Sequence, residues 1–266
     1  MALLAASGIG ISFGGVRAVD DVSFSVNAGE IFSVIGPNGA GKTTLFNLVS
    51  GLYAADAGNI SLNGESVTGL PPEKLAAKGL SRTFQNLQIF FRMTAIENVM
   101  LGRHVHEDKS VFRHLLGLPS TGRQNRETRD YAMELLRHQK LEAIADQPAG
   151  SLPYGVLKRL EIARALACEP KVLLLDEPAA GCNATETAEI DHLIVEVANT
   201  GVGVVLVEHD MKLVMAISHR VYVMAQGRML MEGKPAEVAN DPRVIEAYLG
   251  TELAGGTELG GNAAHA

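Results

Sequence analysis

The sequence contains no tryptophan, only two cysteines, and few aromatic residues, which make up 5% of the chain. Cys168 and Cys182 are too few for a disulfide framework, and neither lies at the spacing of a metal-binding Cys-x-x-Cys motif. We therefore expect the chain to work in a reducing cytoplasmic compartment. The first seven residues lack the basic start and sustained apolar core of a secretory signal, so we expect them to begin the fold.

Long hydrophobic runs and an excess of basic charge are also missing. Apolar runs such as Val172–Leu175 and Val202–Val207 are far shorter than the roughly 20 residues that a membrane-spanning helix needs. Any membrane association is therefore expected to come through a partner. The chain has 23 basic and 30 acidic residues, which disfavours a surface that neutralises nucleic-acid phosphates. We expect no nucleic acid among its partners.

The hydrophobic residues that are present, 47% of the chain, occur in alternating strand-like and helix-like patterns. Ile31–Ile35 leads into a glycine-rich loop and a helix, and Val172–Leu175 ends in two acids. This order predicts an α/β core with a parallel sheet. Segments near Gly58–Asn63 and Val221–Met231 contain Asn-Gly and Gln-Gly pairs, which predict antiparallel hairpins beside that sheet.

A different pattern, that of amphipathic helices, lies between about Met93 and Asp146. We take residues 93–170 as a helical subdomain inserted in the core of a domain that covers residues 1–250. Residues 251–266 are rich in glycine and poor in large hydrophobic side chains, so we expect them to form a flexible tail.

The segment from Gly36 to Thr43 has the P-loop pattern G-x-x-x-x-G-K-[ST] between a strand-like run and a helix. In such a loop the backbone N–H groups bind phosphate oxygens, the Lys42 ammonium reaches the β- and γ-phosphates, and the Thr43 hydroxyl binds Mg²⁺. A glycine turn without this role is the weaker interpretation, because chance produces the full pattern with a probability of about one per cent. The predicted nucleotide-binding residues here are Gly36, Pro37, Asn38, Gly39, Ala40, Gly41, Lys42, Thr43 and Thr44.

Two carboxylates, Asp176 and Glu177, follow the run Val172–Leu175. They fall at the carboxyl end of a predicted parallel strand, where α/β folds bind their ligands. We predict that Asp176 holds Mg²⁺ and that Glu177 orients and deprotonates the attacking water. The alternative interpretation is that the two carboxylates only form the polar end of a strand. The P-loop earlier in the chain favours the catalytic interpretation.

Three further elements occur in the order found in the ABC transporter ATP-binding family: Gln85 within Arg82–Asn86, the stretch Leu152–Val156, and His209. The chain resembles this family over about residues 8–250. The resemblance implies a P-loop NTPase core with an antiparallel β subdomain and an inserted α-helical subdomain, and it implies ATP and Mg²⁺ as cofactors. It also implies that Gln85 senses the γ-phosphate and Mg²⁺ and that His209 contacts the γ-phosphate, which makes both residues catalytic together with Glu177.

The stretch Leu152–Val156 resembles the family's signature loop, whose usual consensus is Leu-Ser-Gly-Gly-Gln. By this resemblance Tyr154 and Gly155 contact the nucleotide of an opposing subunit from a helix N-terminus. Pro153, Tyr154 and Val156 depart from the consensus. We therefore expect this contact to rely more on the backbone than it does in the family as a whole.

An aromatic residue upstream of the P-loop, Phe13, falls where the family places a ring that stacks on adenine. A phenylalanine suits this role because it presents a flat π-face. A core phenylalanine is the alternative interpretation, because aromatic residues bury readily.

Within the family the chain is most similar to the ATPases of branched-chain amino-acid uptake systems. Four segments carry this likeness: Arg82–Asn86, Glu177–Gly181, Glu208–Met215 and Val244–Gly250. It implies an ATP-hydrolysing motor of an import complex for branched-chain or related amino acids, peripheral on the cytoplasmic face of the inner membrane. The implied partners are a second ABC ATPase subunit, identical or a companion, two membrane permease subunits and, indirectly, a periplasmic binding protein.

Alternatives remain for both the function and one segment. The ATPase of a lipid or lipopolysaccharide exporter would share every ATP-site residue, and a non-transport ABC ATPase is a more distant alternative. The apolar and aromatic stretch Leu87–Met93 is expected either to form part of a groove for a short permease helix or to belong to the subdomain core.

Overall fold

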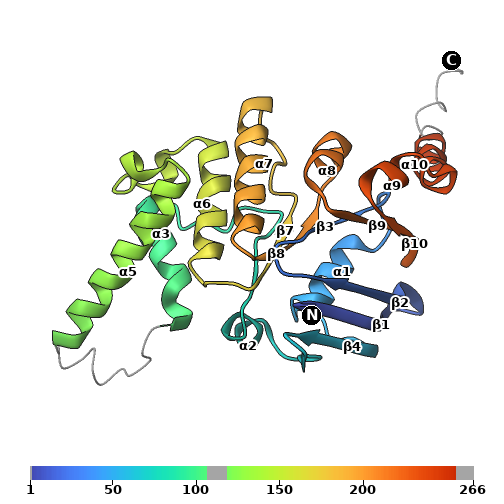
Figure 1. Cartoon of the computed structure of the whole chain (residues 1–266), viewed down its shortest axis with the longest axis horizontal. Coiled ribbons are helices and arrows are strands. Elements are labelled where there is room, and N and C mark those ends of the chain that lie inside the picture. The colour runs from blue at the N-terminus through green and yellow to red at the C-terminus, as the bar shows by residue number, and fades with distance from the viewer. Residues whose placement is uncertain (1, 107–118, 256–266) are drawn as a thin grey trace, which may run out of the picture.

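The computed structural model describes residues 2–106 and 119–255, and in this part the strands form two sheets (Figure 1). The larger sheet has the order β10-β9-β3-β8-β7-β6, and its strands are parallel except for β10. Its strands are β3 (Ile31–Ile35), β6 (Leu80–Arg82), β7 (Val172–Asp176), β8 (Gly203–Val207), β9 (Arg220–Ala225) and β10 (Arg228–Gly233). The smaller sheet is antiparallel and has the order β2-β1-β4-β5. Its strands are β1 (Leu4–Phe13), β2 (Val16–Val26), β4 (Ala57–Leu62) and β5 (Glu65–Ser66).

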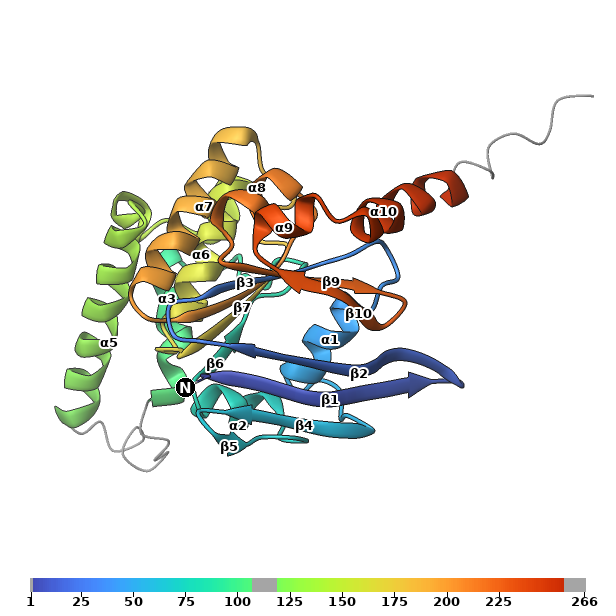
Figure 2. The same cartoon turned by 45° about the vertical axis from the view of Figure 1, so that its right-hand side comes forward.

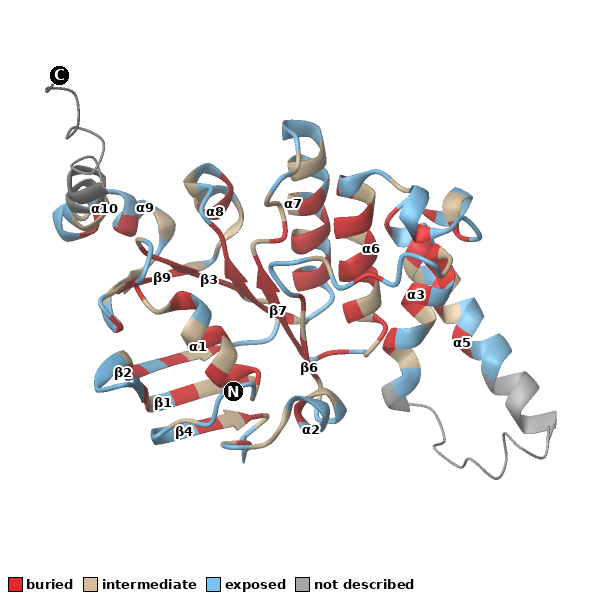
Figure 3. Cartoon of the chain, turned by 180° about the vertical axis from the view of Figure 1, so that it is seen from behind, coloured by how far each residue is buried: buried red, intermediate tan, exposed pale blue. Residues whose placement is uncertain are grey.

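The central strands β3, β7 and β8 are buried along their whole length, and Figure 3 shows β3 and β7 almost wholly in the colour of buried residues. Near-continuous apolar runs of this kind are typical of parallel strands that are covered on both faces. Neighbouring residues of β3 enter different cores, because side chains alternate between the faces of a strand. Phe32 packs with the smaller sheet and with α1 (Lys42–Val49), whereas Ile31 packs with α7 (Ala184–Asn199).

Each face of the larger sheet is therefore covered by a different layer. Helix α1 lies between the two sheets (Figure 2). The other face is covered by α7, which buries Ile190, Leu193, Ile194 and Val197 at helical spacing. Helix α7 begins with a capping box between Asn183 and Glu186. Helices α8 (Met211–Ile217), α9 (Pro235–Ala239) and α10 (Pro242–Gly255) also lie on this side, and α6 (Tyr154–Leu166) adds Ile162 and Ala165 to the core beneath α7.

A group of helices lies between β6 and β7 in the sequence and forms a separate hydrophobic cluster. Its main members are α3 (Ala95–Gly102), α5 (Pro119–His138) and α6 (Tyr154–Leu166). These helices fall within residues 93–170, and the division of the chain into subdomains stays a prediction. In the part of the chain that the structure describes, no helix combines the length and the apolar character needed to cross a membrane. The shorter elements are α2 (Pro72–Ala77), η1 (Arg103–His106), η2 (Glu142–Ile144) and η3 (Ala149–Ser151).

The C-terminal segment differs in part from the expectation of a tail after residue 250. Helix α10 continues to Gly255, so the first residues of the predicted tail are helical. Residues 256–266 lie outside the described residues, and the predicted flexibility of the segment stays a prediction.

Helices α3 and α6 pack together at Gly102, where an added Cβ would lie 2.1 Å from the carbonyl oxygen of Arg164. We expect Gly102→Ala to lower the free energy of unfolding by about 1–3 kcal/mol, because the added methyl group forces two packed helices apart. Urea unfolding followed by circular dichroism measures this change.

The matched control is Leu101→Ala, because the side chain of Leu101 is 40% exposed on the same helix. This variant should change the free energy of unfolding by no more than about 0.5 kcal/mol. An equal loss in both variants would contradict a close helix contact at Gly102.

Candidate nucleotide-binding site

A cavity of about 560 Å³ is lined by residues that are far apart in the sequence. The P-loop, the end of β7, the end of β8 and the β9–β10 turn all contribute to its wall. The lining residues are Val16, Arg17, Ala18, Asn38, Gly39, Ala40, Gly41, Lys42, Thr43, Thr44, Gln85, Glu177, His209, Gln226 and Gly227.

The P-loop connects β3 to α1 and requires glycine for its shape. Gly41, the N-cap of α1, has a φ of 100°, and an added Cβ would lie 2.5 Å from the carbonyl oxygen of Ala18. The first turn of α1 contains no acidic side chain, so the partial positive charge of the helix N-terminus is not neutralised within the helix. A loop of this kind before a helix N-terminus fits a phosphate group.

Lys42 is buried at this loop, and its Nζ donates to the carbonyl oxygens of Gly36 at 2.6 Å and Pro37 at 3.0 Å. Burial lowers the pKa of the Lys42 ammonium, and the charges of Glu177 and Asp176 oppose this effect. Gly36 and Pro37 are not among the residues that line the cavity. The carbonyl groups of Gly36 and Pro37 instead bind Lys42, which does line the cavity.

The three residues predicted to be catalytic meet at the carboxylate of Glu177. Its Oε1 lies 2.7 Å from Nε2 of His209, and its Oε2 accepts a hydrogen bond from Nε2 of Gln85 at 3.2 Å. Glu177 has a φ of 50°, which is uncommon for a residue other than glycine, and its N–H donates to the carbonyl oxygen of Val207. The structure thus brings Gln85, Glu177 and His209 together around one carboxylate.

Asp176 is nearly buried at the end of β7 and forms an ion pair with Arg82, with 2.8 Å between its Oδ2 and Nη2 of the arginine. The Thr43 side chain is exposed toward the cavity. A hydroxyl, a carboxylate and the amide oxygen of Gln85 are hard oxygen ligands of the kind that Mg²⁺ prefers. Thr43 and Gln85 line the cavity, whereas Asp176 does not line it but precedes the lining residue Glu177. The chemistry of these donors fits a magnesium ion.

A buried carboxylate supports the loops behind this cluster. Oε1 of Glu208 accepts from the N–H of Ala179 at 3.0 Å, and Oε2 accepts from the N–H of His209 at 3.1 Å. Burial raises the pKa of Glu208. Burial, followed by the charges of Glu208 and Asp210, raises the pKa of Asp191 on α7 to about 6. The negative charges of Glu208 and Asp210 thus oppose ionisation of Asp191.

Like Gly36 and Pro37, the predicted nucleotide contacts Phe13, Tyr154 and Gly155 are not among the residues that line the cavity. Phe13 is 46% exposed at the end of β1, and its ring contacts the ring of Tyr53 edge-on with a centroid distance of 5.4 Å. Tyr154 and Gly155 lie at the start of α6, and the Glu186 side chain covers Gly155 so closely that an added Cβ would overlap its carboxyl group. The stacking role of Phe13 and the contact of Tyr154 and Gly155 with an opposing nucleotide stay predictions.

The β9–β10 turn and the start of β2 belong to the cavity, although the sequence did not place them there. The N–H of Gly227 donates to the carbonyl oxygen of Ala40 at 3.0 Å. The N–H of Asp20 donates to the carbonyl oxygen of Gly227 at 2.8 Å. The Gln226-Gly227 pair predicted the turn itself. Its position beside the P-loop depends on the parallel pairing of β9 with β3, for which the sequence has no local signal.

Three charged residues are spaced along α6, and we call them the α6 stripe: Lys158, Glu161 and Arg164. The sequence interpretation did not predict their contacts. Nζ of Lys158 donates to the carbonyl oxygens of Gln85 and Glu177, each at 3.4 Å. Glu161 accepts from the N–H of Gln88 at 3.2 Å, and the Arg164 guanidinium donates to the carbonyl oxygen of the same residue. The stripe therefore attaches α6 to the loop that carries Gln85.

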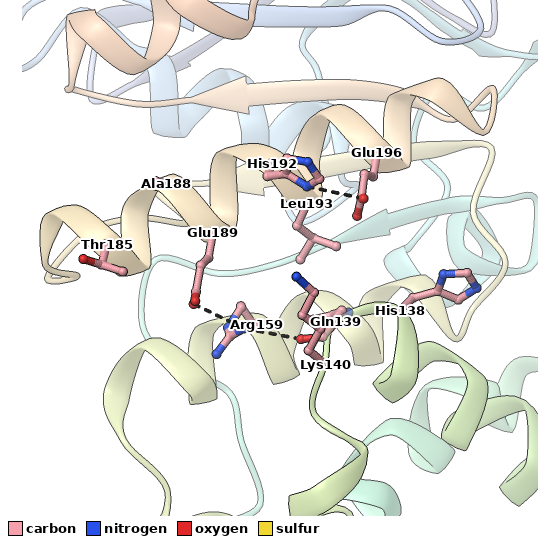
Figure 4. A pocket seen from close by; sticks show the side chains of 10 residues that line it. All are labelled: His138, Gln139, Lys140, Arg159, Thr185, Ala188, Glu189, His192, Leu193 and Glu196. Atoms are coloured by element: carbon pink, nitrogen blue, oxygen red, sulfur yellow. Dashed lines mark hydrogen bonds and ion pairs between the residues drawn. The ribbon is translucent and has the colours of Figure 1, made fainter.

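A second cavity, of about 330 Å³, lies between the end of α5 and the helices α6 and α7 (Figure 4). Across it, Nη1 of Arg159 lies 3.3 Å from Oε2 of Glu189, which joins α6 to α7. His138 and Lys140 add cationic or titratable groups to its wall, and Glu196 adds a carboxylate. None of the residues around it belongs to the predicted catalytic set, so this cavity marks a joint between helices.

The raised pKa of Asp191 generates a pH-dependent prediction. The folded protein holds this proton up to about pH 6, whereas the unfolded chain releases it near the ordinary pKa of 3.8, so wild-type stability falls as pH rises through this window. We expect Asp191→Asn to raise the free energy of unfolding at pH 8 by about 1 kcal/mol, a value reduced for the partial exposure of the carboxyl group. Urea unfolding of both proteins at several pH values measures the difference.

At pH 4 the gain should be much smaller than at pH 8, because Asp191 is then protonated in the folded state and already partly protonated in the unfolded state. A gain of the same size at pH 4 and pH 8 would show that packing, and not the carboxylate charge, causes the effect.

Two protein-family models match parts of the chain. A family model described as "ABC transporter" matches residues 19–180, and one described as "Branched-chain amino acid ATP-binding cassette transporter" matches residues 228–254. The chain is 45% identical to the high-affinity branched-chain amino acid transport ATP-binding proteins BraF of Pseudomonas aeruginosa and LivG of Escherichia coli. Each alignment covers 93% of this chain and 98% of the relative.

Two solved structures described as ATP-binding cassettes of ABC transporters have the same fold. One, nucleotide-free, has a TM-score of 0.82 at 32% identity and covers 93% of this chain and 99% of that one. The other, in its ADP conformation, has a TM-score of 0.82 at 33% identity, and the match covers 94% of this chain and 99% of that one. The predicted P-loop α/β fold class and the predicted activity class, ATP hydrolysis coupled to transport, are confirmed. The chain belongs to the ABC transporter family of ATP-binding cassettes.

Proposed function

We propose that the protein is the ATP-hydrolysing subunit of an ABC import complex for branched-chain or related amino acids. The observation that carries the proposal is the carboxylate of Glu177, held by Gln85 and His209 beside the P-loop lysine. The names of BraF and LivG support the substrate class. The match of residues 228–254 to the branched-chain amino-acid model supports it independently of the ATP site.

In this proposal the P-loop residues from Gly36 to Thr44 bind the phosphates of ATP, and Lys42 supplies the cation that faces the β- and γ-phosphates. Thr43, Asp176 and Gln85 hold Mg²⁺, which neutralises charge on the phosphates when it is bound. The shape of the loop at Gly41 and the position of the Lys42 ammonium support these assignments.

Glu177 orients the attacking water and accepts its proton as the water attacks the γ-phosphorus. The contacts of its two oxygens with His209 and Gln85 restrict the carboxylate to one orientation, which lowers the entropy cost of positioning the water. His209 then contacts the γ-phosphate with its half-exposed imidazole ring. Hydrolysis here depends on positioning and charge, because phosphoryl transfer needs no covalent intermediate with the protein.

Two ATPase subunits close head to tail in this proposal, and each nucleotide lies between the P-loop of one and the signature loop of the other. Tyr154 and Gly155 serve the opposing nucleotide, and Phe13 stacks on adenine in its own subunit. The place of Tyr154 and Gly155 at the N-terminus of α6, outside their own chain's nucleotide cavity, supports this arrangement. The pair docks on two permease subunits at the cytoplasmic face of the inner membrane and responds to a periplasmic binding protein through them.

The stretch Leu87–Met93 supports a docking role for its aromatic pair. Phe90 and Phe91 are 55% and 52% exposed, whereas Ile89 between them and the Gln85 loop is buried in the helical cluster. The buried amide of Asn98 holds the backbone of Phe90 in place through hydrogen bonds to both its N–H and its carbonyl oxygen. A fixed backbone with two exposed rings suits a groove that receives a short permease helix.

An exporter ATPase is the second candidate function. The lipopolysaccharide export system ATP-binding protein LptB of Escherichia coli is 36% identical over 95% of this chain and 99% of its own length. That identity is lower than the 45% for BraF and LivG. The uptake system is therefore the better supported of the two functions.

Replacement of Glu177 tests the catalytic proposal. We expect Glu177→Gln to lower the rate of ATP hydrolysis by at least about 100-fold, because the amide cannot accept the proton of the attacking water. Nucleotide affinity should change little, since the P-loop is intact. Phosphate release under saturating Mg²⁺ and ATP measures the rate, and titration with a fluorescent ATP analogue measures the affinity.

Glu196→Gln on α7 is the matched control, and it should hydrolyse ATP within about twofold of wild type. Unchanged turnover in Glu177→Gln would refute the base assignment.

Size-exclusion chromatography with light scattering, on Glu177→Gln with ATP and Mg²⁺ present, tests which partner completes the ATPase pair. A dimer means that the chain closes on itself, and a monomer means that a companion ATPase or the permeases are required.

Replacement of Phe91 tests the docking surface. We expect Phe91→Asp to reduce amino-acid uptake by the assembled transporter at least about tenfold, because a charge enters an apolar contact with the permease. ATP hydrolysis by the isolated subunit should stay within about twofold of wild type, because Phe91 lies outside the nucleotide cavity. Uptake into proteoliposomes and hydrolysis in solution give the two rates.

Leu101→Asp provides the control, because Leu101 is also exposed but belongs to α3. It should leave uptake unaffected. Loss of folding in Phe91→Asp, seen as a lost thermal transition, would place the ring in the core and end the docking proposal.

A further inference from the structure

Arg82, the last residue of β6, is a nearly buried cation beside the nucleotide site. Its side chain is 7% exposed, and that of its ion-pair partner Asp176 is 4% exposed. Nη2 donates to Oδ2 of Asp176 at 2.8 Å, whereas Nη1 donates at 2.7 Å to both Oδ1 of Asn47 and Oγ of Ser50. One guanidinium therefore connects the carboxylate at the end of β7 to the C-terminal turn of α1.

Two aromatic rings restrict the guanidinium further. Its central carbon lies 5.6 Å from the ring centroid of Phe46 and 5.1 Å from that of Phe84, within the range of cation–π attraction. Among the described residues Nε of Arg82 has no hydrogen-bond partner, and such a buried donor costs stability. Buried ion pairs also stabilise little compared with apolar side chains of similar size. Stability alone is therefore a poor explanation for an arginine at this position.

Arg82 connects two elements that carry predicted nucleotide-site residues, α1 and β7. Helix α1 carries the P-loop lysine at its first residue and the Arg82 acceptors in and just after its last turn. Thr83, the next residue, donates its N–H to the carbonyl oxygen of Leu174 at 2.9 Å, which ties the same segment to β7. The guanidinium binds Oδ2 of Asp176, and in the proposed function the same carboxylate would serve the Mg²⁺ site.

We propose that Arg82 is a positioning residue for Mg²⁺, which holds the Asp176 carboxylate at a fixed distance and orientation relative to the P-loop helix. The proposal rests on the proposed function, in which Asp176 belongs to the Mg²⁺ site. Partners that orient a metal-binding side chain typically contribute about 10- to 100-fold to metal affinity or activity. The effect of Arg82 should therefore appear in the Mg²⁺-dependent part of nucleotide binding.

The test compares nucleotide binding with and without the metal. Equilibrium titration of the purified full-length chain with a fluorescent ATP analogue gives one Kd in Mg²⁺ and another in EDTA. For Arg82→Gln we expect the Kd in Mg²⁺ to rise at least about tenfold, and the Kd in EDTA to stay within about twofold of wild type. Arg82→Lys keeps the charge but lacks the planar fork, so it should fall between the wild type and Arg82→Gln.

Arg220→Gln is the matched control, because Arg220 also makes two ion pairs, with Glu30 and Glu232, and lies over an aromatic ring, that of Phe32. It does not line the nucleotide cavity. We expect it to lower the Tm without changing the ratio of the two Kd values. If Arg82→Gln behaves in the same way, Arg82 is only a structural ion pair and the proposal fails.

A milder variant keeps the test decisive if Arg82→Gln does not fold. Asn47→Ala leaves the pair between Arg82 and Asp176 in place and removes one acceptor on α1. It should raise the Kd in Mg²⁺ about threefold, with the Kd in EDTA unchanged. Equal losses with and without Mg²⁺, or tighter binding with Mg²⁺, would overturn the proposal. A wild-type chain that binds no ATP would instead refute the proposed function.

Discussion

The parallel register of β3, β8 and β7 is the constraint on which the nucleotide site depends. Val34 pairs with Val207, and Val207 pairs with Asp176, so these strands end at the same level of the sheet. The P-loop, the Glu177 turn and the His209 loop therefore emerge side by side. A slip of one residue in any of these strands would exchange its two faces, and both faces are buried. The apolar cores on either side of the sheet thus maintain the geometry of the proposed catalytic cluster around Glu177, although none of their residues belongs to it.

Much of the fold and part of the candidate site could be predicted from the sequence, because their signals are local. The P-loop is one continuous pattern with a fixed geometry, and apolar runs that end in Asp176 or Glu208 identify strand ends. Once the strands are taken as parallel, their carboxyl ends must share one edge, so the meeting of Glu177 and His209 follows. The same reasoning gives the α/β class, which the solved relatives confirm.

Other features depend on pairings between distant segments, which a single sequence does not show. The ion pair of Arg82 with Asp176 requires β6 to lie beside β7, and the place of Gln226 in the cavity requires β9 to lie beside β3. The surroundings of Phe13 at the end of β1 depend on where Tyr53, after α1, lies relative to the smaller sheet. For the α6 stripe, three charged residues on one helix resemble a solvated face, and only the fold shows that they bind the Gln85 loop.

The α6 stripe has a consequence for the direction in which a signal travels through a pair of these subunits. The middle of α6 is attached to Gln88, which lies close in the sequence to the exposed rings that we propose as a docking surface, and the first residue of α6 is Tyr154. Rigid secondary elements are among the structures that carry energetic coupling between distant sites. A push received at one permease would then reach the ATP that the other subunit holds. In the proposed pair, the state of each permease would then affect ATP hydrolysis at the nucleotide held by the opposite subunit. The two hydrolysis events would depend on each other without any direct contact between the two permeases.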